Sequence, residues 1–144
     1  MTAYDISQLP AVASDGESIR LPAIRVRIEP SEIAAFSAAT KATGNPDFVP
    51  LTFPCRWLAL PDVRMLILRM IGGDGYLPVH EAQSFSYEKR LEANIPYILT
   101  IAAESKNQPR RIVLQMKVST ENGSICARLE TILRSVRLFP ESRA

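Results

Sequence analysis

The sequence is poor in the residues that most often perform chemistry. Histidine occurs once, at His80, and cysteine occurs twice, at Cys55 and Cys126, with no CxxC spacing. The two cysteines indicate neither a disulfide framework nor a structural zinc site, which fits a reducing compartment. We therefore expect no metal and no resident cofactor. Any mechanism that needs an imidazole has to use His80.

The sequence also shows no strong net charge, no signal-peptide pattern in its first residues and no long hydrophobic run. A net charge of +2 over 144 residues is too small to indicate binding to nucleic acid or to an anionic membrane. The first 16 residues contain no basic-then-apolar signal region, and the longest apolar stretch, residues 65–71, is too short to span a bilayer. This length suits one domain. We predict a single cytoplasmic domain at residues 18–140, after a flexible lead at residues 1–17.

The first half of the chain predicts one strand and two helices. Residues 18–28 alternate in their second half between apolar and basic side chains, as in a half-buried strand. Pro30 is suited to the first position of a helix that runs to about Lys41, and Glu32 lies in its first turn, where a carboxylate is favoured by the positive end of the helix dipole. The proline-rich segment 44–56 predicts an irregular loop. Residues 61–71 are apolar nearly all round, which predicts a helix buried on several sides.

Four antiparallel strands are predicted for the second half, around residues 79–91, 97–101, 112–118 and 125–138. In the first of these, Val79, Phe85, Tyr87 and Leu91 are expected on one face. Asn122-Gly123 favours a tight hairpin between the last two strands, because both residues tolerate positive φ. A change of apolar parity predicts a bulge near Ile132-Leu133. The whole order predicts an α+β fold, with a five-stranded antiparallel sheet wrapped around a buried central helix.

Four segments in this order resemble a known family. They are residues 32–40, Gly44-Asn45-Pro46, residues 50–54 and residues 77–87, which contain His80-Glu81 and Phe85-Ser86-Tyr87. Together they resemble the MaoC-like dehydratase and hydratase superfamily, in its N-terminal or non-catalytic type of domain. The resemblance covers roughly residues 18–137. It implies a hot-dog fold and, as ligand, an acyl thioester of coenzyme A or of an acyl carrier protein.

The sequence departs from the family at the two positions that perform catalysis. Active members have an Asp two residues before the Asn of this loop and a His two residues after its Pro, and here these positions hold Thr43 and Phe48. Threonine has no useful base at neutral pH, and phenylalanine has no proton to transfer. The resemblance therefore implies no catalytic residues, and a substrate-binding set of Asn45, Phe48, Trp57 and His80.

Each remaining candidate has a structural interpretation beside the functional one. Phe48 and Trp57 line an acyl tunnel or belong to the core, and His80 is a base or a hydrogen-bonding structural residue. The functional interpretation of Asp62 and of Glu81 is that one of them is the carboxylate of a thioesterase. The structural interpretation of Asp62 is that it stabilises the first turn of a helix. Four arginines have phosphate binding as their functional interpretation and a solvated strand face as their structural one: Arg25, Arg27, Arg110 and Arg111.

Three functions follow from these alternatives. The first is the non-catalytic subunit of a 3-hydroxyacyl-thioester dehydratase or (R)-enoyl-thioester hydratase, paired with a catalytic hot-dog subunit. The second is an acyl-CoA thioesterase that uses Asp62 or Glu81. The third is a homodimeric acyl-CoA-binding scaffold without turnover. All three predict a homodimer or heterodimer, because one such sheet has an exposed edge strand and a half-covered central helix.

Overall fold

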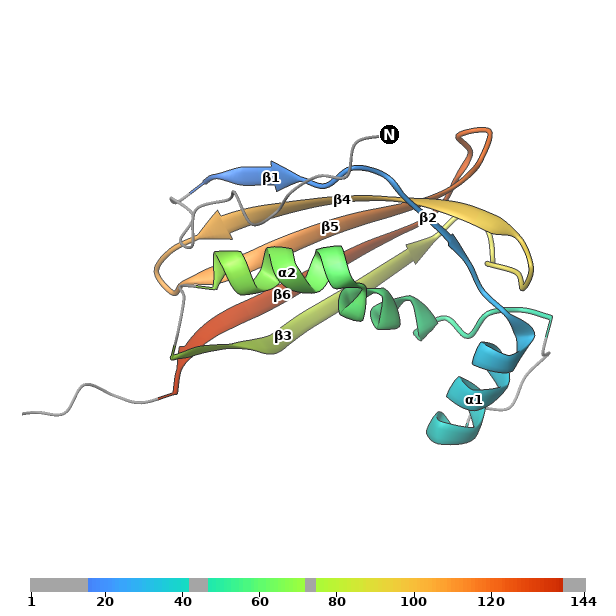
Figure 1. Cartoon of the computed structure of the whole chain (residues 1–144), viewed down its shortest axis with the longest axis horizontal. Coiled ribbons are helices and arrows are strands. Elements are labelled where there is room, and N and C mark those ends of the chain that lie inside the picture. The colour runs from blue at the N-terminus through green and yellow to red at the C-terminus, as the bar shows by residue number, and fades with distance from the viewer. Residues whose placement is uncertain (1–15, 42–46, 72–74, 139–144) are drawn as a thin grey trace, which may run out of the picture.

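A computed structural model of the chain describes residues 16–41, 47–71 and 75–138. Its strands are β1 (Ser18–Arg20), β2 (Ile24–Arg27), β3 (Tyr76–Tyr87), β4 (Pro96–Lys106), β5 (Arg111–Thr120) and β6 (Ile125–Arg137). Its helices are α1 (Pro30–Thr40), the short 3₁₀ helix η2 (Phe53–Ala59) and α2 (Pro61–Met70). Figure 1 shows α2 lying along one face of a twisted sheet, with α1 at one end of it.

The strands form one antiparallel sheet in the order β1-β4-β5-β6-β3, and β2 also pairs with β4. The sheet has six strands rather than the predicted five, because the expected strand at 18–28 is divided into β1 and β2. The division falls at Pro22-Ala23, where proline lacks the amide that a continuous ladder needs. The hairpin predicted at Asn122-Gly123 is confirmed, and Gly123 has a φ of 93°.

The central helix α2 is buried on one side only. Val63, Leu66 and Met70 are almost fully covered by the sheet and η2, whereas Met65 and Leu68 are 41% and 47% exposed. The prediction of burial on several sides is therefore wrong for this chain taken alone. No helix within the described residues is long and apolar enough to cross a membrane.

The predicted bulge lies at the expected level of the sheet but on the other strand. His80 pairs with Leu133 and Ala82 pairs with Ile132, so the extra residue is Glu81 of β3. Side chains alternate between the two faces of the sheet, and the extra residue shifts this alternation by one position beyond the bulge. The prediction that Val79 and Phe85 share one face is therefore wrong, and Val79 is 46% exposed.

The segment before α2 is more regular than the predicted loop. Residues 53–59 form η2, which tolerates Pro54 because proline is allowed in the first turn of a helix. Phe53 and Trp57 of η2 are buried. The amide of Leu60 donates to the carbonyl of Trp57 (3.1 Å), so η2 leads directly into α2.

The carboxyl end of α2 is held by side chains from the sheet. The hydroxyl of Ser135 donates to the carbonyl of Ile71, and the guanidinium of Arg110 lies 3.5 Å from the carbonyl of Met70. These contacts satisfy carbonyl groups that have no partner within a helix. They fix the position of α2 on the sheet, and with it the position of the pocket at its amino end.

Candidate binding pocket at the start of the central helix

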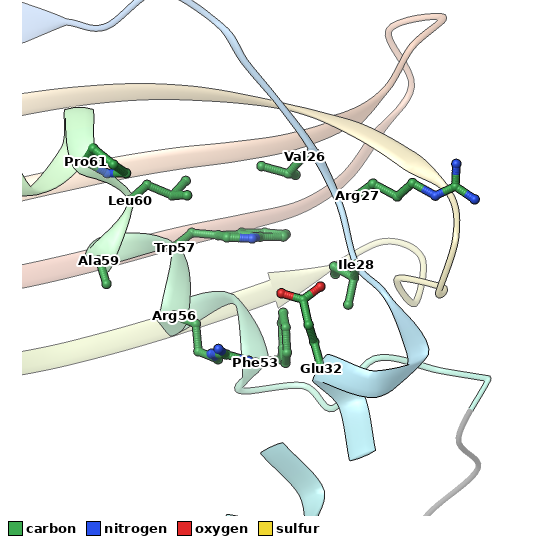
Figure 2. A pocket seen from close by; sticks show the side chains of 10 residues that line it. All are labelled: Val26, Arg27, Ile28, Glu32, Phe53, Arg56, Trp57, Ala59, Leu60 and Pro61. Carbon is green, nitrogen blue, oxygen red and sulfur yellow. The ribbon is translucent and has the colours of Figure 1, made fainter. Parts of the chain in front are cut away.

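A pocket of about 280 Å³ lies where β2, α1, η2 and the first residues of α2 meet. Figure 2 shows the side chains that line it, which come from segments far apart in the sequence. They are Val26, Arg27, Ile28, Glu32, Phe53, Arg56, Trp57, Ala59, Leu60 and Pro61. The volume is near the lower end of the range for small-molecule sites, so the pocket suits a short ligand group.

Aromatic rings with fixed orientations form one wall of the pocket. Phe53 and Trp57 are only 2% and 6% exposed. The ring of Phe53 packs edge-to-face against Phe36 of α1 at 5.3 Å and against Trp57 at 6.4 Å between centroids. Such contacts are favourable for aromatic pairs, and they join α1 to η2. The wall is therefore formed by the fold before any ligand is bound.

Glu32 places a carboxylate at this apolar wall. Its Oε2 accepts a hydrogen bond from the amide of Glu29 (2.8 Å), which fixes the side chain across the first turn of α1. In Figure 2 the carboxylate points into the space beneath Trp57, between Ile28 and Phe53. Sequence reasoning assigned Glu32 only to the helix dipole, because nothing in its spacing shows that β2 and η2 meet beside it.

The two arginines of the pocket are directed elsewhere. The guanidinium of Arg56 lies over the ring of Phe53, 5.2 Å from its centroid. Arg27 extends away from the pocket in Figure 2, and its Nε is 3.8 Å from a carboxylate oxygen of Glu29. Neither arginine pairs with Glu32 in the part of the chain that the structure describes.

Of the predicted substrate-binding residues that the structure describes, Trp57 alone lines this pocket. Thr43 and Asn45 lie outside the described residues. Phe48 is 37% exposed and forms an isolated bridge with Glu92. The guanidinium of Arg90 covers its ring at 5.5 Å. The roles of Asn45 and Phe48 in a substrate site stay predictions.

His80 lies in a separate polar group on β3 and β6. Its Nε2 is 3.1 Å from Oε1 of Gln83, which also accepts a hydrogen bond from the hydroxyl of Thr131 (2.6 Å). His80 is exposed and does not line the pocket. The structure thus gives it an amide partner rather than a carboxylate.

The two carboxylates proposed for a thioesterase do not meet at the pocket. Asp62 is exposed in the first turn of α2. Glu81 accepts two hydrogen bonds from Arg134, at 3.1 and 3.2 Å, beside the bulge. Over residues 16–41, 47–71 and 75–138, no group of three or more His, Cys, Asp or Glu side chains could hold a metal ion.

The arginines considered for phosphate binding are also separated. Arg25 forms an ion pair with Glu121 at 2.6 Å, at the end of the sheet where β4 begins. Arg110 and Arg111 lie at the opposite end of the sheet, where β5 begins. They therefore do not form one phosphate-binding cluster.

Tyr87 contacts the loop that precedes η2, and Cys55 lies within η2; neither is suited to proton transfer at neutral pH. The hydroxyl of Tyr87 donates to the carbonyl of Leu51 (2.5 Å), and burial raises the pKa of Tyr87 to about 12. Burial also raises the pKa of the Cys55 thiol above its ordinary value. A thiol with a raised pKa is mostly protonated and is a weak nucleophile.

No family model and no curated protein matches this chain in sequence. Solved structures do match its fold. It is similar to a hot-dog-like protein from Thermanaerovibrio acidaminovorans (14% identity, TM-score 0.62, covering 85% of this chain and 83% of that one). It is also similar to the C-terminally truncated HadBC (3R-hydroxyacyl-ACP dehydratase) complex from Mycobacterium tuberculosis (16% identity, TM-score 0.63, covering 83% and 96%).

A third similar structure is the fluoroacetyl-CoA-specific thioesterase FlK, with 12% identity and a TM-score of 0.59 over 88% of this chain and 90% of that one. These likenesses confirm the predicted α+β hot-dog fold. The fold that the MaoC-like resemblance implied is therefore present. At such low identities the likenesses leave the function open, since one fold can carry several functions.

Proposed function

We propose that the chain is an acyl-thioester-binding hot-dog protein that has no hydratase activity on its own. In this proposal it is the non-catalytic subunit of a 3-hydroxyacyl-thioester dehydratase or (R)-enoyl-thioester hydratase. The observation that supports it best is the pocket at Trp57, which is lined mainly by apolar side chains and contains no histidine. Both HadBC and FlK are named for acyl-thioester substrates, which makes this ligand class the first to test.

The pocket accounts for how a thioester would bind. The acyl chain would lie against Val26, Ile28 and Trp57, and the thioester oxygen would lie at the amino end of α2, where Asp62 and Val63 carry the first amides because Pro61 has none. Those amides have no acceptor within the helix and lie at the positive end of its dipole. The rest of the carrier would extend into solvent. The arrangement lacks the histidine of the family's acid–base pair, and its one carboxylate, Glu32, accepts a hydrogen bond from the amide of Glu29.

The absence of turnover follows from the acid and base that hydration requires. A general acid or base typically contributes a factor of about 10²–10⁴ in rate. Phe48 occupies the position of the family's histidine, and His80 is outside the pocket. The thioesterase alternative gains no support either, because Glu81 is paired with Arg134 and Asp62 does not line the pocket.

The proposal includes a second hot-dog subunit, either a copy of this chain or a catalytic partner. Within the described residues β3 pairs only with β6, so its other edge is free along 12 residues. Met65 and Leu68 are exposed on α2 and are separated by three positions, which places them on one side of the helix. A free strand edge beside exposed apolar side chains favours association with another chain.

Calorimetric titration with butyryl-CoA and with free coenzyme A tests the binding proposal. We expect butyryl-CoA to bind and coenzyme A to bind at least tenfold more weakly, about 1.4 kcal/mol. Val26→Phe should fill the pocket and weaken butyryl-CoA binding by a similar factor. Ile24→Phe is the matched control, because Ile24 is a partly buried residue of the same strand that does not line the pocket. Equal affinities for the two ligands would argue against the proposal.

A further inference from the structure

The carboxylate of Glu32 is an unusual group for a pocket that receives hydrocarbon. One of its oxygens accepts the hydrogen bond from the amide of Glu29. A carboxylate has about four acceptor sites, so it can accept further bonds from the pocket side. Figure 2 shows this group facing Ile28, Phe53 and Trp57 across the cavity. An occupant made only of hydrocarbon would displace water from the carboxylate and would offer no hydrogen-bond donor in its place.

Among the described residues, no cationic side chain forms an ion pair with Glu32. Arg56 lies on the ring of Phe53, and Arg27 points away and lies near Glu29. Glu32 forms no ion pair over residues 16–41, 47–71 and 75–138. The group that satisfies the carboxylate when the pocket is filled therefore has to come from the ligand.

We propose that Glu32 is a specificity-determining residue. It makes the pocket favour acyl groups whose chain carries a hydrogen-bond donor, a hydroxyl or an ammonium, over unsubstituted acyl groups of the same length. This inference rests on the acyl-thioester function proposed above. The donor lies on the first carbons of the chain, because the pocket is small. A hydrogen bond to a charged acceptor is stronger than one between neutral groups, which provides the discrimination.

Calorimetry with three ligands of equal chain length tests the inference on the full chain: butyryl-CoA, 3-hydroxybutyryl-CoA and 3-aminobutyryl-CoA. We expect at least one donor-bearing ligand to bind about tenfold more tightly than butyryl-CoA. Comparison of the hydroxyl and amino ligands distinguishes a neutral donor from a cationic one.

Glu32→Gln is the informative variant, because glutamine can still accept the hydrogen bond from Glu29 and keep the start of α1 intact. We expect it to lower the preference for a donor by about threefold or more, and to lower it most for the ammonium. Glu32→Leu should bring butyryl-CoA level with the donor-bearing ligands or ahead of them. Glu29→Gln is the control, since Glu29 precedes the same helix and does not line the pocket.

The outcomes separate this inference from the function on which it rests. Binding of all three thioesters with equal affinity by the native chain, or unchanged ratios in Glu32→Gln, overturns the inference alone. Absence of binding by all three overturns the proposed function, and the inference with it.

Discussion

At the scale of single residues, Tyr87 connects the end of β3 to the loop that precedes η2. Its hydroxyl donates to the carbonyl of Leu51, 36 residues earlier in the chain. Burial raises its pKa to about 12, so the phenol ionises more readily in the unfolded chain, where its pKa is about 10. The stabilisation from Tyr87 is therefore complete below pH 10 and is lost as the pH rises through 12.

Tyr87→Phe tests this contact. At pH 8 we expect it to lower the free energy of unfolding by about 1 kcal/mol, the usual net contribution of a hydrogen bond. The difference between the native chain and the variant should then narrow between pH 10 and pH 12. Urea unfolding at pH 8 and at pH 11 measures both effects. A difference that stays constant with pH would mean that the phenol is not protected as the structure shows.

The same scale shows what sequence reasoning reaches and what it misses. Trp57 was predicted as a residue of either the core or an acyl pocket, and it lines the pocket and is buried. Glu32 was assigned to the helix dipole alone, and its second role depends on a contact between α1 and η2 that no local pattern encodes. Val79 was placed on the wrong face because a bulge moves every side chain beyond it to the other side.

At the scale of elements, hydrophobic periodicity and helix signals predicted α1, α2 and the strands β4, β5 and β6. The exceptions follow from proline and from tertiary packing. Pro22 divides the first strand, and Phe53 and Trp57 make residues 53–59 regular by packing into the core. The bulge was inferred at Ile132-Leu133, opposite its real position at Glu81, because a strand's own pattern does not reveal which partner carries the extra residue.

The exposed side of α2 yields a prediction at this scale. Leu68→Lys places a charge where we propose that a second subunit packs, so it should weaken dimerisation and convert dimer to monomer at micromolar concentration. Val136→Lys is the control. Val136 is also exposed (38%), but it lies on β6 rather than on the free edge strand β3, and its neighbour Ser135 points to α2, so Val136 lies on the opposite face of the sheet.

Light scattering on the native chain and both variants measures the change. A monomeric native chain, or a Leu68→Lys variant that stays dimeric, would contradict the proposed subunit contact. Purification from the native host adds the identity of the partner. A catalytic hot-dog subunit bound to this chain supports the heterodimer, and a pure homodimer supports the scaffold.

At the scale of the whole molecule, the fold and the predicted loss of the family's acid–base groups together favour binding without turnover. The sheet holds α2 by both its buried face and its carboxyl end, and this fixes a pocket at its amino end. The pocket has apolar surface and the carboxylate that we propose as a selector, and we predict that Phe48 takes the position of the family's histidine. The account is therefore one of binding separated from turnover.

Trp57 allows both halves of that account to be measured in one sample, because it is the only tryptophan of the chain. The isolated protein is titrated with crotonyl-pantetheine while the emission of Trp57 and the absorbance of the enoyl thioester are followed together. The account predicts a saturable change in emission, absent with pantetheine alone, and no hydration above the uncatalysed rate. Hydration above that rate, or emission that does not respond to the acyl group, would contradict it.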